Sequence, residues 1–253
     1  MRHHEKTQPG NPHELTINQH VFPSASIARF AQEDGQVVVF LKGKEKTIRC
    51  RPQAKLFCAK RVWNQPAEHG FMKKIEGAFQ DLAERILDGS MSHVLAPTEH
   101  EIVSNFYALC RLRANLRLAP PPDVQMKGVL PESYLSKDQE EILEKKGYIF
   151  ARGTTMLGRH IASIQIQASL YRLCAPETTW AIIYSRDVEF VVPDSFFEIK
   201  VVPLSPNYCL VANQRSGEIS SENAVAINQL AIQRSSEYYF SRDFLKCGIS
   251  PSS

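Results

Sequence analysis

The sequence has few glycines and none of the short motifs that mark the common nucleotide and metal enzymes. Its 12 glycines are scattered over 253 residues, and no G-x-G-x-x-G or G-x-x-x-x-G-K-S/T loop occurs. H-E-x-x-H, G-x-S-x-G and C-x-x-C are also missing. No apolar run is long enough to span a membrane, and no signal peptide follows the first residues. We therefore expect a cytoplasmic protein without a cofactor, a bound metal or a membrane partner.

The content of apolar residues is sufficient for a real core. Of the 253 residues, 43% are hydrophobic, which allows a domain of this size to bury the surface it needs. We expect a flexible tail at residues 1–16, a single domain at residues 17–245 and a short tail at residues 246–253. The six cysteines are scattered among apolar neighbours, as is typical of a reducing compartment. The sequence carries no signal for an oligomeric state.

Helix-like and strand-like segments occur in separate parts of the chain. Apolar residues recur at helical spacing in three segments, residues 70–87, 98–118 and 159–173. Short runs of β-branched and aromatic residues predict strands at residues 36–40, 46–50, 180–184, 188–192 and 208–212. Tight turns at 42–44 and 185–187 predict two hairpins. The pattern indicates an α+β fold, in which a mainly antiparallel sheet packs with several helices.

Asp194 is the first candidate for a functional side chain. It closely follows the apolar run 188–192, and an ionisable residue at the end of a buried strand is costly unless it is paired or functional. Asn228 lies in the same part of the chain, where a scaffold could bring it near Asp194. His20 is the best placed of the histidines. We expect these three residues to be catalytic.

Positive charge is concentrated in one segment, although the net charge is only +3. Eight Lys and Arg residues lie between positions 42 and 61. Such a run suits contacts with phosphate groups, and it is also typical of a solvated hairpin. The residues expected to contact phosphates are Lys42, Lys44, Lys46, Arg49 and Arg51.

Five further side chains are candidates for substrate binding. They are Arg111, Arg113, Glu76, Phe22 and Tyr208. The two arginines also have a structural explanation, because a helix dipole favours cations near its carboxyl end. Glu76 could equally be a surface carboxylate that pairs with a neighbour on its helix.

An ordered set of short motifs resembles the large bacterial family known as domain of unknown function 4238. The resemblance covers about residues 18 to 242. It rests on segments around His20, Glu76, Arg113, Asp194 and Asn228, among them Val192-Pro193-Asp194-Ser195 and Ile227-Asn228-Gln229-Leu230. Around Asp194 this sequence has Val-Pro-Asp-Ser-Phe in place of the family's usual Thr-Ser-Asp-x-Pro. The resemblance implies an active site of His, Glu, Arg, Asp and Asn, and by analogy a nucleic-acid substrate in an antiviral setting.

The first hypothesis is a hydrolase that acts on nucleic acid, most concretely a DNA glycosylase that excises a modified base from phage DNA. Asp194 would orient a water and offset the charge of an oxocarbenium-like sugar. Asn228 and His20 would hold the departing base, and an aromatic residue such as Phe22 or Tyr208 would stack on it.

Two alternatives remain open at this stage. A metal-dependent nuclease could use Glu76 and Asp194 to bind a divalent ion. A non-catalytic module that binds or senses nucleic acid would use its buried polar residues as a structural network, which looks the same in a sequence.

Overall fold

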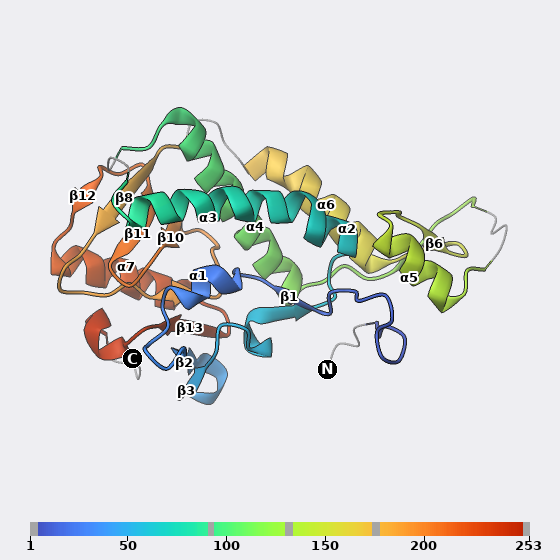
Figure 1. Ribbon diagram of the computed structural model, residues 1–253, viewed down its shortest axis with the longest axis horizontal. Coiled ribbons are helices and arrows are strands. Elements are labelled where there is room, and N and C mark those ends of the chain that lie inside the picture. The colour runs from blue at the N-terminus through green and yellow to red at the C-terminus, as the bar shows by residue number, and fades with distance from the viewer. Residues whose placement is uncertain (1–4, 91–93, 130–133, 174–177, 250–253) are drawn as a thin grey trace.

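The computed structural model describes residues 5–90, 94–129, 134–173 and 178–249 of the chain (Figure 1). One four-stranded sheet has the order β10 (Val201–Pro203), β11 (Tyr208–Ala212), β8 (Trp180–Tyr184) and β12 (Gly217–Glu218). The other has the order β3 (Lys46–Cys50), β2 (Val37–Leu41), β13 (Tyr238–Ser241) and β9 (Val192–Pro193). Neighbouring strands are antiparallel except for β12 and β8.

Two smaller sheets complete the strands of the described residues. One pairs β1 (Asn18–His20) with β4 (Cys58–Lys60), and the other has the order β5 (Val124–Gln125), β7 (Thr155–Met156) and β6 (Ala151–Arg152). The α-helices are α1 (Ser24–Ala28), α2 (Gln65–Ala67), α3 (Lys73–Leu87), α4 (Pro97–Leu118), α5 (Lys137–Lys145), α6 (Gly158–Leu173) and α7 (Ser221–Arg234). Short helical turns of other types are η1 (Lys42–Lys44), η2 (Lys55–Phe57), η3 (Glu68–Met72) and η4 (Phe244–Cys247). The predicted α+β class with antiparallel sheets is confirmed.

Helix α4 connects the two main parts of the core. On one side it packs against α3, where Phe106 stacks on Phe79 in a cluster that includes residues of both four-stranded sheets. On another side Ala108 and Leu109 join a second cluster with Trp63 and residues of α6. Figure 1 shows α4 between the sheets and the end of the molecule that carries α5. Because one helix contributes to both clusters, the described chain forms a single domain.

The segments predicted to be helical are helical. Helix α4 begins at Pro97 rather than after Thr98, because proline at the first helical position has its φ already fixed and has no N–H to satisfy. Glu99 accepts a hydrogen bond from the main-chain N–H of Ala96 at 2.7 Å. The Glu99 carboxylate therefore satisfies one main-chain N–H at the start of α4.

One predicted hairpin is confirmed and the other is wrong. Strands β2 and β3 pair over residues 37–50 as expected. The segments 180–184 and 188–192 separate instead, because β8 pairs with β11 and β12, while β9 pairs with β13 of the other sheet. Between them the main-chain N–H groups of Glu189 and Phe190 donate to the carbonyls of Lys246 and Pro206. The chain uses this stretch to cross from one sheet to the other.

The described ends of the chain pack against the domain. In the amino-terminal segment, Leu15 is 2% exposed, and the main-chain N–H of Gln8 donates to Oε1 of Glu141 on α5 at 2.9 Å. Near the other end, Cys247 is fully buried. The segments expected to be flexible tails are therefore bonded to the domain over residues 5–16 and 246–249. Their outermost residues, 1–4 and 250–253, lie outside the described part of the chain.

Across the described residues, no helix combines the length and the apolar composition needed to cross a bilayer.

Candidate functional site

Asp194 lies just after β9 and is only 7% exposed. Its Oδ1 accepts the N–H of Ser236 at 2.7 Å, and its Oδ2 accepts the N–H groups of Glu237 and Tyr238 at 2.7 and 3.1 Å. Burial raises the pKa of this carboxyl group, and the three N–H groups and Arg117 oppose that rise. Both oxygens are engaged with the turn that leads into β13. The geometry therefore favours a structural role for the residue that we expected to orient a water.

Asn228 is fully buried on α7, and each end of its amide has a main-chain partner. Its Oδ1 accepts the N–H of Val191 at 2.9 Å, and its Nδ2 donates to the carbonyls of Glu189 and Cys247 at 2.8 and 3.0 Å. One side chain thus ties α7 to the crossing segment and to η4. It satisfies main-chain groups that would otherwise be buried without partners.

His20 is half-buried at the end of β1, where its Nε2 lies 3.2 Å from the carbonyl oxygen of Pro52. Among the described residues, none of the hydrogen bonds of His20, Asp194 and Asn228 links one of the three to another. The structure does not assemble them into one cleft.

Two residues expected to bind substrate are paired with each other. Arg113 is 1% exposed, and its Nη1 donates to Oε1 of Glu76. Its Nη2 lies 3.4 Å from a carboxylate oxygen of Glu68, and its guanidinium lies 5.3 Å from the ring centre of Trp63. Arg113 thus joins α4 to α3 and η3, and its placement is explained by this internal ion pair.

The other predicted substrate contacts belong to separate surroundings. Phe22 is 4% exposed and packs in the aromatic core against Phe106, Phe196 and Phe240. Arg111 lies over the ring of Phe197, at 5.2 Å from its centre. Tyr208 on β11 packs against Tyr184 of the neighbouring strand, with 5.7 Å between the ring centres.

The basic hairpin is partly engaged in internal contacts. Lys42 donates to the carbonyls of Ile232 and Ser235, where it satisfies the carboxyl end of α7. Arg49 pairs with Asp34 at 2.9 Å. The three remaining residues of the predicted phosphate contacts are exposed, namely Lys44, Lys46 and Arg51.

Neither carboxylate of the nuclease alternative faces the other. Glu76 is bonded to Arg113, and Asp194 is bonded to the main chain of residues 236–238. Over the part of the chain that the structure describes, no group of three or more His, Cys, Asp or Glu side chains is arranged to hold a metal ion.

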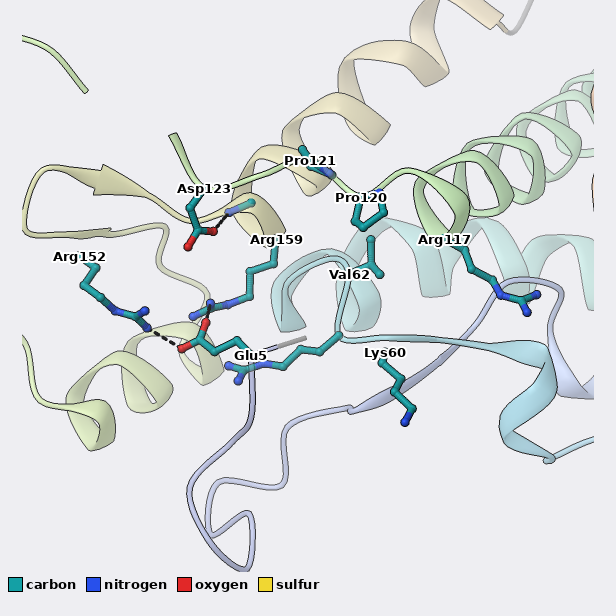
Figure 2. A pocket seen from close by; sticks show the side chains of 11 residues that line it. Glu5, Lys60, Val62, Arg117, Pro120, Pro121, Asp123, Arg152 and Arg159 are labelled. Carbon is teal, nitrogen blue, oxygen red and sulfur yellow. Dashed lines mark hydrogen bonds and ion pairs between the residues drawn. The ribbon is translucent and has the colours of Figure 1, made fainter. Parts of the chain in front are cut away.

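A different group of side chains surrounds a cavity of about 310 Å³ where β4 ends and α6 begins (Figure 2). We call this cavity the arginine pocket, after five basic side chains in its lining: Lys60, Arg61, Arg117, Arg152 and Arg159. Two acidic residues, Glu5 and Asp123, also line it. Its volume is at the lower end of the range for small-molecule sites, which suits a ligand group rather than a large ligand.

Acidic side chains of helix α5 hold three arginines of this pocket in place. Glu144 is 1% exposed, and its Oε2 accepts from Arg61 Nη2 at 2.8 Å and from Arg159 Nε at 2.7 Å. Burial raises the pKa of Glu144, and the two arginines more than offset this, so the pKa is lowered. Glu140, one turn earlier, accepts two bonds from Arg152 at 2.6 and 2.7 Å. The acidic face of α5 therefore fixes three guanidinium groups toward the pocket.

Arg61 and Arg159 still have hydrogen-bond donors without an acceptor. Their side chains are 1% and 4% exposed. Within the described residues, Nε and Nη1 of Arg61 and Nη2 of Arg159 have no hydrogen-bond partner. Buried guanidinium N–H groups are costly to leave unpaired, and an acceptor that reached these donors would remove that cost.

The amino end of α6 contributes to the same wall. The Gly158 N–H donates to Oδ1 of Asp123 at 2.7 Å, and the helix dipole places positive potential at this end. A Cβ at position 158 would lie 2.2 Å from the carbonyl oxygen of Pro121. Glycine is therefore required for α6 to approach the proline segment that closes this side of the pocket.

Arg61 also has an unusual main-chain conformation. Its φ is +47°, in the left-handed region that residues with a Cβ avoid. Its N–H donates to the carbonyl of Ile17, and its side chain pairs with Glu144. These bonds hold a conformation that costs on the order of 1–3 kcal/mol.

The arginine pocket was not predicted from the sequence, although two features of the sequence point to it. Arg159 lies in the first turn of a helix, where a cation is unfavourable beside the positive end of the dipole. Glu140, Glu141 and Glu144 lie on one helical face that reads as solvated, yet each is at most 2% exposed. These segments are far apart in the sequence, and only their opposite charges indicate that they lie together in the fold.

Comparison of the chain with protein families, with curated proteins and with solved structures gave no match.

Proposed function

We propose that this protein is a binding module for a phosphate-bearing ligand, with nucleic acid as the ligand class and the arginine pocket as the site. The observation that carries the proposal is the pair Arg61 and Arg159, which line the cavity and whose buried guanidinium groups retain unpaired donors. Arginine is suited to phosphate because its planar fork donates two parallel bonds. Exposed Lys44, Lys46 and Arg51 would add weaker contacts with the backbone of a longer ligand.

We propose binding rather than hydrolysis because of the surroundings of Asp194. A glycosylase needs a carboxylate oxygen free to hold a water, and the oxygens of Asp194 accept three main-chain N–H groups. The buried polar residues are better explained as structural, which agrees with the sensor alternative. The resemblance to domain of unknown function 4238 remains compatible with either activity.

Fluorescence anisotropy with labelled DNA tests the proposal. We expect Arg61→Lys and Arg159→Lys to weaken binding about tenfold, because lysine keeps the charge that Glu144 needs and loses the planar fork. Arg186→Lys is the matched control, since this arginine is exposed in the turn after β8. Equal affinity of all four proteins would refute the assignment of the pocket. Mass spectrometry of the same mixtures, with plain and base-modified DNA, would reveal released bases if the protein is a glycosylase.

A further inference from the structure

The arginine pocket already contains an anionic group, and this group belongs to the protein. Glu5 reaches it from the amino-terminal segment, with Oε1 bonded to Arg152 and Oε2 bonded to Arg159 (Figure 2). Oε1 also accepts a hydrogen bond from Lys137. The Glu5 side chain is 30% exposed, compared with 1% for Arg61. The Glu5 carboxylate therefore lies nearer to solvent than the guanidinium group of Arg61 does. A ligand that enters from solvent could replace this carboxylate.

A carboxylate does not satisfy all the donors that surround it. Both oxygens of Glu5 are engaged, while Nε and Nη1 of Arg61 and Nη2 of Arg159 have no acceptor. A phosphomonoester has three terminal oxygens and a charge of about −1.5 to −2 at neutral pH. It could replace both oxygens of Glu5 and still present a third to the unpaired donors.

The charges around the pocket also depend on Glu5. The lining and the charged side chains bonded to it contain six basic groups, the five of the lining and Lys137, and five carboxylates, namely Glu5, Asp123, Glu140, Glu144 and Glu237. Removal of Glu5 leaves two positive charges uncompensated in a partly buried place. A dianion that replaces Glu5 compensates both.

We propose that the arginine pocket takes a terminal phosphate group, and that this phosphomonoester enters by displacing the carboxylate of Glu5. The inference rests on the proposed function, because it names the part of the nucleic acid that the pocket binds. A phosphodiester inside a duplex is held at the surface by the nucleotides on both sides. It cannot reach guanidinium groups that are 1% and 4% exposed, whereas a chain end can be inserted.

The first test compares two labelled oligonucleotides of one sequence that differ only in a 5′-phosphate or a 5′-hydroxyl group. We expect the full-length protein to bind the phosphorylated end at least about tenfold more tightly. Glu5→Gln should tighten binding of the phosphorylated end about tenfold further and leave the other unchanged, because it removes a tethered competitor. Glu14→Gln is the control, since Glu14 lies in the same segment and is exposed. Free nucleoside monophosphate, added as a competitor, separates a small ligand from a chain end.

A second measurement uses the unaltered protein, so it does not depend on the folding of a variant. The N–H of Gln8 is protected by its bond to Glu141. If Glu5 leaves the pocket, hydrogen exchange of residues 5–9 should accelerate when the phosphorylated oligonucleotide is bound, and the hydroxyl form should have no effect.

The possible outcomes test the terminal-phosphate inference and the proposed function separately. Equal binding of the two ends, weakened by Arg61→Lys, overturns the terminal-phosphate inference and leaves the proposed function intact. Binding of nucleoside monophosphate without either oligonucleotide supports the inference and overturns nucleic acid as the ligand. If nothing binds, both are overturned. If Glu5→Gln does not tighten binding and exchange of residues 5–9 is unchanged, Glu5 is a structural residue and displacement is refuted.

Discussion

Replacement of Asp194 is the sharpest test of whether this carboxylate supports the fold or performs chemistry. Asp194→Ala would leave three main-chain N–H groups without their acceptor. The N–H of Tyr238 is in a buried residue, whereas Ser236 and Glu237 are exposed enough for water to replace the lost bonds in part. One buried donor costs about 1–3 kcal/mol and the two others about 0.5–1 each, so we expect a loss of about 3 kcal/mol in the free energy of unfolding.

Asp194→Asn should be milder, because the amide keeps one oxygen that can face Glu237 and Tyr238. Its NH₂ group would then oppose the N–H of Ser236, at a cost of about 1 kcal/mol. The measurement is urea unfolding, in which about 3 kcal/mol corresponds to a midpoint shift of about 1 M or more. Asp187→Ala, in an exposed turn, should change the midpoint little.

The reasoning is refuted if Asp194→Ala unfolds at the same urea concentration as the unaltered protein. If that stable variant also lost a base-releasing activity, the carboxylate would be catalytic, because active-site residues are often removed without loss of stability.

Two further predictions concern residues at the amino end of α6. Burial, and after it the positive charge of Arg159, lowers the pKa of His160 from 6.5 to about 4. As the pH falls, the unfolded chain therefore binds this proton at a higher pH than the folded protein does. Stability should be complete above about pH 6.5 and fall by about 3 kcal/mol toward pH 4, and His160→Gln should flatten this slope in unfolding measured across that range. Gly158→Ala should cost about 1–3 kcal/mol and weaken DNA binding, because its Cβ would lie 2.2 Å from the Pro121 carbonyl oxygen. Gly77→Ala, with open space around it on α3, should stabilise by about 0.5–1 kcal/mol, and the opposite order of the two glycine variants would contradict the packing argument.

The helices could be predicted because their patterns are local. In α3, the apolar residues Phe79, Leu82 and Ile86 recur at helical spacing and all are buried. The hairpin of β2 and β3 has the same kind of local signal in its short turn. The chain from β8 to β9 has a turn-like sequence too, but the main-chain partners of its second segment come from residues 206 and 246. Such distant partners leave no trace in a local pattern.

The roles of candidate site residues are harder to predict from a sequence, for a physical reason that Asp194 illustrates. A buried carboxylate must be paired or functional, and this much follows from its position after an apolar run. The sequence cannot distinguish the two cases, and the structure supplies three main-chain N–H partners. The arginine pocket is the reverse case, because the structure indicates a site that the sequence does not. Most of its residues carry no local signal in the sequence, and only their arrangement around Glu144 indicates a site.

The attachment of Glu5 has a consequence for the growing chain. Glu5 precedes its partner Arg159 by 154 positions, so at about 5–20 residues per second the acid waits on the order of ten seconds on the ribosome before that arginine is made. When the last wall of the pocket is synthesised, this tethered acid is already present at a high local concentration. The proposed ligand would therefore compete with an acid that is tethered to the same chain and stays at that local concentration for the life of the molecule.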